Sequence, residues 1–148
     1  MSFCGRQSHF VRRLKTDSVC GQCPPGWKWF QNGCYYFSEA TQNWLVARSW
    51  CLNKGAQLVI VNTKEEQNRI TSRVYWLGMT DQNVEQEWYW VDGSPVKLSF
   101  WSTGEPNDYR GEDCGTIAID GRWNDISCHM TDYWICEKLC PSEFRMTV

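Results

Sequence analysis

Hard oxygen ligands are concentrated in one stretch of this chain, between residues 105 and 125. Carboxylate and amide oxygens suit a cation that takes ~6 to 8 oxygen ligands at ~2.3 to 2.6 Å, as Ca²⁺ does. Several of these groups keep spare hydrogen-bonding capacity, so they could contact a ligand and the metal together. The sequence therefore predicts a calcium site with five side chains: Glu105, Asn107, Glu112, Asn124 and Asp125.

The charge balance of this stretch supports a bound cation. Six acidic residues between positions 105 and 125 face only two basic ones, Arg110 and Arg122. Without a cation these carboxylates would repel one another. The simpler alternative is a solvated acidic loop that turns at Pro106.

Catalysis finds little support in the same residues. Glu105 and Glu112 are two carboxylates, as in the catalytic pair of a glycosidase. Such a pair needs separated pKa values so that one group acts as acid and the other as base, whereas calcium keeps carboxylates ionised. His9 and His129 are not placed to form a nucleophile and base pair. We predict that the protein is not an enzyme.

Length, charge and cysteine content restrict the class of protein. A chain of 148 residues forms one domain of ordinary size. Its net charge of -2 excludes the broad basic face that nucleic acids require. No apolar run approaches the ~20 residues that cross a bilayer, and the amino terminus lacks the apolar core of a signal peptide. Nine cysteines indicate an extracellular or lumenal protein, so Met1 without an export signal indicates an excised ectodomain or a processed form.

The elements that must position these ligands indicate an α+β fold. Residues 1–22 are expected to be a poorly ordered basic linker or neck stub, residues 23–140 the folded domain and residues 141–148 a tail. Thr41 is expected to cap a helix that runs to about Lys54, and the capping box Thr63-Lys-Glu-Glu66 predicts a second helix that fades near Ser72. Short strands are predicted at residues 33–37, 58–61, 76–79, 87–91, 116–119 and 133–136. The long irregular stretch from 91 to 113 indicates a functional loop.

Aromatic residues are abundant but are expected mainly in the core. Tyr109 follows the Glu105-Pro-Asn107 motif by two residues, and it is predicted either to border a ligand or to be an exposed loop residue. Trp101 enters the long loop, and its place is left open. The tryptophans that fall mostly in predicted strands and helices are expected to be buried: Trp27, Trp44, Trp50, Trp76, Trp88, Trp90, Trp123 and Trp134.

Residues 23–140 contain a series of cysteines and three short motifs. They are six cysteines (Cys23, Cys34, Cys51, Cys114, Cys128 and Cys136), Trp76-Leu-Gly-Met79, Glu105-Pro-Asn107 and Trp123-Asn-Asp125. Together they resemble the long form of the C-type lectin-like domain, and most of all type II membrane receptors such as the dendritic-cell mannose-type lectins and the low-affinity immunoglobulin E receptor. The resemblance implies the C-type lectin fold, with two helices, two small antiparallel sheets and a long calcium-binding loop region.

The resemblance also implies a disulfide framework. It joins Cys23 with Cys34, Cys51 with Cys136 and Cys114 with Cys128, and by similarity to the receptor group it joins Cys20 with Cys140. Spacing alone does not choose among the connectivities. The alternative is a zinc site from Cys20-x-x-Cys23 and Cys136-x-x-x-Cys140, which would break two of these disulfides. Cys4 is then either an unpaired linker thiol or an intermolecular bridge.

By the same resemblance, the five predicted ligands form the family's principal calcium and sugar site. Two sugar hydroxyls would complete the coordination of the ion, with Glu105 and Glu112 accepting their hydrogen bonds and the amides of Asn107 and Asn124 donating to them. In the family, Glu-Pro-Asn goes with mannose-type sugars and Gln-Pro-Asp with galactose. We therefore expect terminal mannose, fucose or N-acetylglucosamine as the ligand, and a cis peptide bond before Pro106.

An auxiliary calcium site is also implied by the resemblance, at Asp81, Glu85, Asp108 and Asp113. Asp108 departs mildly from the family, in which several relatives have Asn. The extra carboxylate increases the attraction for a cation and also the repulsion in an empty site. The alternative is that Asp81 and Glu85 are surface loop charges.

The sequence thus predicts an extracellular, calcium-dependent lectin domain, either secreted or part of the ectodomain of a type II membrane receptor. Its expected partners are mannose-type glycans on glycoproteins or microbial surfaces, with avidity from a homo-oligomer formed through the neck or through Cys4. The main alternative is a protein-binding receptor domain on the same fold that retains calcium for its loop structure. An ice-binding or toxin-like variant is a third class, for which the sequence offers no positive sign.

Overall fold

The computed structural model describes residues 20, 22–68, 73–84, 86–106 and 112–140. The chain divides into two compact units, one of residues 1–36 with 137–148 and the other of residues 37–136. It enters and leaves the second unit within two strands, β2 (Gly33–Phe37) and β8 (Tyr133–Leu139). The expected linker and tail lie outside the described residues, apart from positions 20 and 22. None of the helices in the described part of the chain is long and apolar enough to cross a bilayer.

The smaller unit is built on a β-hairpin and two disulfides. Strand β1 (Lys28–Phe30) pairs antiparallel with β2, and the amide of Cys140 donates to the carbonyl of Asn32 at 2.7 Å. The disulfides join Cys23 with Cys34 and Cys20 with Cys140. A unit this small buries little apolar surface, so cross-links that restrict the unfolded chain contribute much of its stability.

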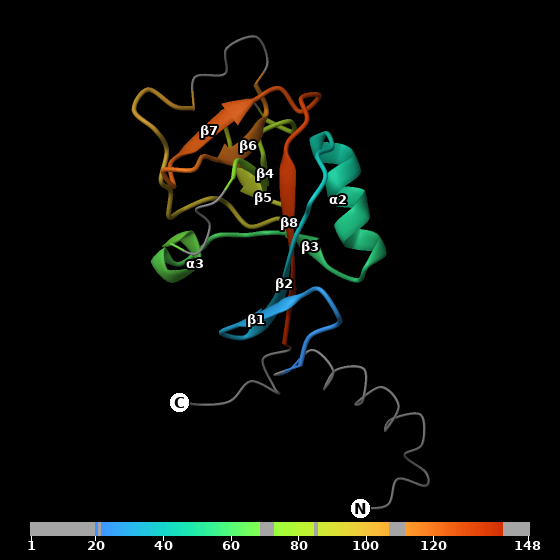
Figure 1. Cartoon of the computed structure of the whole chain (residues 1–148). Helices are drawn as coiled ribbons and strands as arrows, with labels where there is room; N and C mark the ends of the chain where they lie inside the picture. Colours follow the sequence, from blue (N-terminus) through green and yellow to red (C-terminus); the bar gives the residue numbers. More distant parts are fainter. Residues whose placement is uncertain (1–19, 21, 69–72, 85, 107–111, 141–148) are drawn as a thin grey trace, which may run out of the picture. The chain divides into compact units, whose positions relative to one another are not determined.

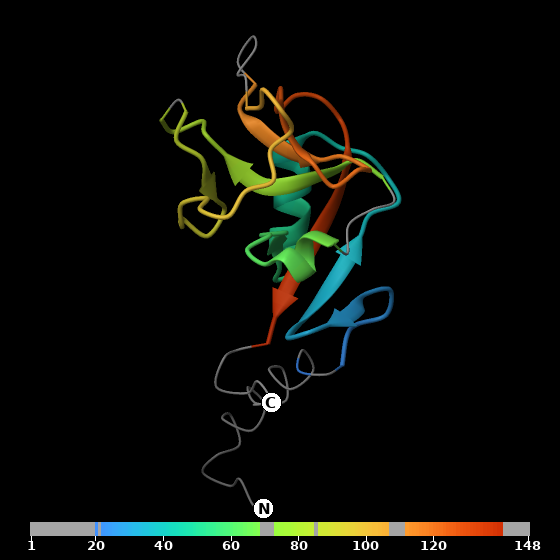
Figure 2. The same ribbon diagram turned by 90° about the vertical axis from the view of Figure 1, so that its left-hand side faces the viewer.

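The larger unit contains a mixed sheet in which the strands follow the order β8, β4, β6, β7 (Figure 1, Figure 2). Strand β4 pairs parallel with β8 and antiparallel with β5 and β6, and β6 pairs antiparallel with β7. The α+β class is confirmed, and the parallel pairing of β4 with β8 adds to the antiparallel pairing that was expected. The strands of this unit other than β8 are β3 (Gln57–Leu58), β4 (Tyr75–Thr80), β5 (Tyr89–Trp90), β6 (Cys114–Ile117) and β7 (Trp123–Ile126).

Strand β7 was not among the predicted strands, and neither was β1. Asn and Asp are depleted in strands, so the residues Trp123-Asn-Asp125 indicate ligands rather than a strand. Pairing with β6 overrides this preference, with Gly115 opposite Asp125 and Thr116 opposite Asn124. The sheet therefore positions two of the predicted calcium ligands directly.

Helix α2 (Trp44–Asn53) begins one residue after its cap, Asn43. The side-chain oxygen of Asn43 accepts a hydrogen bond from the amide of Val46 at 2.9 Å. The expected cap at Thr41 is therefore wrong, because Asn43 directly precedes the first helical turn and satisfies one of its free amides. The helix ends at Asn53 with Lys54 as its C-cap, close to the expected end, and Gly55 follows with φ of 71°.

Helix α3 (Lys64–Asn68) begins at the predicted capping box. The amide of Glu66 donates to the hydroxyl of Thr63 at 3.1 Å, and the Glu66 carboxylate accepts from the amide of Asn62 at 3.1 Å. The carboxylate thus reaches one residue further back than expected. The predicted end near Ser72 lies outside the described residues. In Figure 1, α2 and α3 lie on opposite sides of the strands of this unit.

The core of the larger unit forms where β3 and β4 meet the inner face of α2, with β6 packed beside β4. Gly78 on β4 allows this close packing, because a Cβ atom there would lie 2.7 Å from the carbonyl oxygen of Leu58. Trp27, Trp50, Trp88 and Trp101 are only half-buried. Five tryptophans are buried as predicted: Trp44, Trp76, Trp90, Trp123 and Trp134.

Candidate metal centre

The loop that ends at Glu105 lies along β7 through backbone contacts. Trp101 and Trp123 form a parallel β-bridge, and the amide of Ser102 donates to the carbonyl of Trp123 at 2.8 Å. The amide of Glu105 then donates to the carbonyl of Ser102 at 2.9 Å. This turn includes Gly104, whose φ of 84° favours glycine. The backbone thereby brings Glu105 towards the acidic residue of β7.

Three of the five predicted ligands meet at this point. Carboxylate oxygens of Glu105, Glu112 and Asp125 lie within 4.8 Å of one another. Asp125 is fully buried, and the two glutamates are half-buried. Three like charges at this distance repel one another, and a divalent cation between them would replace that repulsion by attraction.

Asn124 provides a separate test of whether a cation fits. Its Oδ1 atom is buried and has no hydrogen-bond partner among the described residues. Leaving a buried polar atom unsatisfied costs about 1–3 kcal/mol, and a hard cation accepts an amide oxygen as a ligand. This oxygen and the three carboxylates therefore fit a calcium ion. Asn107, the fifth predicted ligand, lies outside the described residues.

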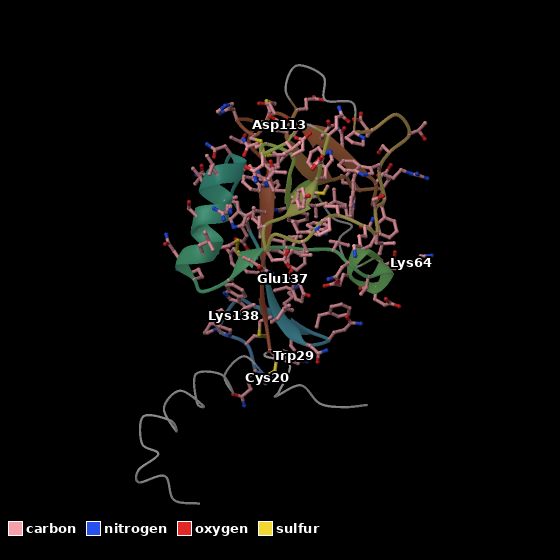
Figure 3. All side chains as sticks on the ribbon, turned by 180° about the vertical axis from the view of Figure 1, so that it is seen from behind. Cys20, Trp29, Lys64, Asp113, Glu137 and Lys138 are labelled. Atoms are coloured by element: carbon pink, nitrogen blue, oxygen red, sulfur yellow. A yellow bond between two sulfur atoms is a disulfide. The ribbon has the colours of Figure 1, made fainter. Side chains whose placement is uncertain are left out.

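The predicted auxiliary ligands Asp81 and Asp113 are connected through the backbone. The carbonyl of Asp113 accepts from the amide of Asp81 at 3.2 Å and from the hydroxyl of Thr80 at 2.6 Å. Asp81 is only 1% exposed, so the alternative of a surface charge is wrong for this residue. Asp113, labelled in Figure 3, directly precedes β6, and its Oδ1 atom is buried without a hydrogen-bond partner in the described ranges.

The remaining predicted site residues cannot be placed in this way. Glu85, Asp108 and Tyr109 lie outside the described residues, as do Asn107 and Cys4. The structure therefore brings together three of the predicted principal ligands, and Asn124 is adjacent to one of them, Asp125, in β7. Separately, it connects two of the predicted auxiliary ligands, Asp81 and Asp113.

Two covalent features implied by the resemblance are present. The Glu105–Pro106 peptide bond is cis. Among the described residues there are four disulfides: Cys20–Cys140, Cys23–Cys34, Cys51–Cys136 and Cys114–Cys128. The alternative zinc site is excluded, because each of its four cysteines is bonded to another cysteine.

The sequence did not indicate one buried polar residue, which contacts the start of β7. Gln67 on α3 accepts a hydrogen bond from the indole Nε1–H of Trp123 at 2.9 Å, and its amide nitrogen donates to the carbonyl of Gly121. A glutamine in a short polar helix gives no sequence signal of burial, because its partners are more than fifty residues away along the chain.

Comparison with known proteins identifies the family. The Lectin C-type domain family matches residues 40–138, so the chain belongs to the C-type lectin domain family. It is 49% identical over 123 residues to human C-type lectin domain family 17, member A. That match covers 80% of this chain but only 32% of the relative, so the chain spans about a third of the relative's length.

Two solved structures show how this fold is used elsewhere. The C-type carbohydrate-recognition domain of cow CD23, determined in the presence of a GlcNAc2Man3 oligosaccharide, has a TM-score of 0.75 and 39% identity, covering 80% of this chain and 96% of that one. A calcium-independent type II antifreeze protein has a TM-score of 0.74 and 32% identity, covering 79% and 94%. C-type lectin domains generally bind calcium and are generally not enzymes. Because the fold also occurs in a calcium-independent protein, the fold alone does not establish calcium binding, and the side chains of the site decide it.

Proposed function

We propose that this domain binds terminal mannose, fucose or N-acetylglucosamine in a calcium-dependent manner. The observation that carries this proposal is the convergence of the carboxylates of Glu105, Glu112 and Asp125 within 4.8 Å. The orphaned amide oxygen of Asn124 supports it independently. Asn107 completes the proposed set of ligands.

A calcium ion at this point would offer coordination positions to two neighbouring sugar hydroxyls. The side chains would complete the recognition, because Glu105 and Glu112 can accept hydrogen bonds from the hydroxyls while the amide nitrogens of Asn107 and Asn124 donate to them. In the order Glu105-Pro-Asn107 the acceptor comes before the donor, and we propose that this order selects the equatorial 3- and 4-hydroxyls of mannose-type sugars. The mannose-containing oligosaccharide named for cow CD23 supports this class of ligand.

A second ion is proposed at Asp81, Glu85, Asp108 and Asp113. The buried Oδ1 atom of Asp113, which has no hydrogen-bond partner in the described ranges, supports it. The carbonyl of Asp113 also holds the end of β4 through Thr80. An ion at this point would therefore fix the start of β6 relative to the loop after β4.

The proposed setting is extracellular, in a secreted protein or in the ectodomain of a type II membrane receptor. Four disulfides among the described residues support an oxidising compartment. A single open site would bind a monosaccharide near the millimolar range, or about -4 kcal/mol. Clustering through the neck segment or through Cys4 would then supply the avidity needed for glycoproteins or microbial surfaces.

The decisive experiment exchanges acceptor and donor across Pro106. The double variant Glu105→Gln with Asn107→Asp should bind mannose more weakly and galactose more strongly on a glycan array run in calcium, while its melting temperature stays close to that of the wild type. Glu39→Gln, an exposed carboxylate on the same unit, is the matched control and should leave the array unchanged. An unaltered sugar preference in the double variant would show that these two residues do not select the ligand.

A second candidate function is supported by a separate surface. A groove of about 600 Å³ between α2 and the segment 82–93 is lined in part by three exposed apolar side chains, Leu45, Val84 and Tyr89. Exposed apolar patches of this kind often mark protein interfaces, which agrees with a protein-binding receptor domain. Competition separates the two candidates: binding of a protein partner that chelation abolishes, but that free mannose and fucose do not inhibit, would favour the second one.

A further inference from the structure

Gln67 connects helix α3 to the hairpin that carries two of the proposed ligands. Its side chain is 6% exposed. The side-chain oxygen accepts from the indole of Trp123 at 2.9 Å, and the side-chain nitrogen donates to the carbonyl of Gly121. An indole N–H can only donate and a backbone carbonyl can only accept, so both partners are satisfied by one planar group that has both functions.

Gly121 lies in the turn between β6 and β7. Its amide donates to the carbonyl of Ala118 at 2.9 Å, and the amide of Ala118 donates to the carbonyl of Arg122 at 2.9 Å. A third contact to this turn, from Gln67, ties it to α3, which lies outside the sheet. A shift of the turn relative to α3 would therefore break this hydrogen bond, and β7 begins two residues after Gly121.

Trp123 connects Gln67 with the two segments that carry Glu105 and Asp125. Its side chain is fully buried, and its ring packs edge-on against Trp90, Phe100 and Trp101 with centroids 5.7, 5.5 and 5.8 Å apart. Its amide donates to the carbonyl of Phe100 at 2.8 Å, and its carbonyl accepts from Ser102. Trp123 thus contacts the loop that leads to Glu105 and directly precedes Asn124 and Asp125.

We infer that Gln67 is a positioning residue for the calcium site. By fixing the ring of Trp123 and the β6–β7 turn, it keeps the carboxylate of Asp125 close to that of Glu105 without contacting the ion. The inference rests on the proposed function, because it concerns the affinity of the same metal centre. Residues that hydrogen-bond directly to the ligands of a metal typically change its affinity by about 10- to 100-fold when mutated. Gln67 acts through Trp123, one residue before Asn124, so the lower end of this range is expected.

The test compares two variants of Gln67 with a control that is destabilised elsewhere. Gln67→Met keeps the length of the side chain and removes both hydrogen bonds, whereas Gln67→Glu keeps the acceptor for Trp123 and removes the donor to Gly121. The control is Ile135→Val, a fully buried position on β8. Calcium binding is measured by titration calorimetry well below the melting temperature of each protein. The indole N–H resonances are recorded on calcium-free protein.

We expect Gln67→Met to raise the dissociation constant for calcium by about tenfold and to shift the Trp123 indole resonance in the calcium-free state. Ile135→Val should lower the melting temperature and leave the dissociation constant within about twofold of the wild type, as expected for a purely structural change. If Gln67→Met does not fold, Gln67→Glu decides the question. The expected result is weaker calcium binding together with a downfield shift of the Trp123 indole resonance, because the carboxylate is a stronger acceptor than the amide.

Two results would overturn the inference. One is a dissociation constant for the Gln67 variant that stays within about twofold of the wild type, and the other is an equal loss of affinity in Ile135→Val. Each would leave the proposed function intact, provided that the wild type takes up calcium. A wild type that takes up no calcium would overturn the proposed function and the positioning role together.

Discussion

Trp101 and Trp123 are joined both through the backbone, as a parallel β-bridge, and through their rings, which lie 5.8 Å apart at an interplanar angle of 82°. Trp101 stands four residues before Glu105, and Trp123 stands two residues before Asp125. The packing of Trp101 against Trp123 therefore helps to bring the carboxylates of Glu105 and Asp125 close together. These contacts join the two segments through groups other than the carboxylates, and preorganisation of this kind favours affinity.

Calcium should stabilise the folded domain. An ion that binds only the folded state adds about 2.7 kcal/mol at a concentration 100 times its dissociation constant, which corresponds to a rise in melting temperature on the order of 10 °C for a domain of this size. Differential scanning calorimetry in calcium and in chelator measures the rise. Magnesium should produce a smaller rise, because it demands stricter octahedral geometry. Identical melting curves with and without calcium would contradict a folded-state metal site.

Removal of one carboxylate from the metal centre should have opposite effects with and without calcium. Glu112→Gln should weaken calcium binding by at least about tenfold, since one charged ligand of three is lost. In the calcium-free protein it should raise the free energy of unfolding by about 1–2 kcal/mol. The substitution removes the repulsion between Glu112 and each of the two remaining carboxylates, and each such pair costs about 1 kcal/mol at 4 Å in water.

Titration calorimetry and urea unfolding measure these two effects of Glu112→Gln. Glu39→Gln, whose side chain is exposed outside the metal centre, should change neither quantity. Unchanged calcium affinity in Glu112→Gln would remove this residue from the set of ligands.

Asp132 gives the larger unit a pH dependence that is independent of the metal centre. Its backbone pairs with Gln42, and burial raises the pKa of its carboxyl from 3.8 to about 6. Between these values the folded state keeps a proton that the unfolded chain releases, so the contribution of Asp132 to stability falls as the pH rises from about 4 to about 6. Above pH 6 the full penalty of the buried charge is present.

Asp132→Asn should remove this dependence. The variant should be more stable than the wild type at pH 7, and the difference should vanish near pH 4, where both forms are neutral. Urea unfolding in calcium-free buffer at several pH values measures it. A difference in stability that is the same at pH 4 and pH 7 would show that ionisation of Asp132 is not its cause.

Gly115 on β6 should accept a side chain only if Met79 moves. A Cβ atom at this position would collide with the side chain of Met79 on β4, and overpacking of a core typically costs about 1–3 kcal/mol. Gly115→Ala should therefore lower the free energy of unfolding by that amount in urea titration. Combined with Met79→Ala, which makes room, its cost should be smaller than in the wild-type background. Strictly additive effects of the two substitutions would show that their side chains do not meet.

The grouping of three carboxylates could be predicted from the sequence because it depends on residue types. Glu105, Glu112 and Asp125 are carboxylates without enough basic neighbours, and this imbalance is visible before any fold is known. The capping box at Thr63 and the strand at residues 33–37 were also correct, since both depend on local preferences. The cysteine pairing came from the family resemblance and not from spacing, which leaves the connectivity open.

The parts that could not be predicted depend on contacts between distant segments. Strand β7 forms because β6 pairs with it, although Asn124 and Asp125 disfavour strands. Gln67 is buried because Trp123 and Gly121 lie beside α3 in the fold, and neither is near it in the sequence. The cap at Asn43 was missed for a different reason: Thr41 and Asn43 are both good caps, and local preference does not choose between them.

The bond between Cys20 and Cys140 has a mechanical consequence. It joins residues 120 positions apart, so tension applied to the chain outside these two cysteines passes through a covalent link and bypasses every residue between them. A domain pulled from both ends could therefore carry load without stretching residues 21–139, and reduction of this one bond would expose the segment between the cysteines to the full force.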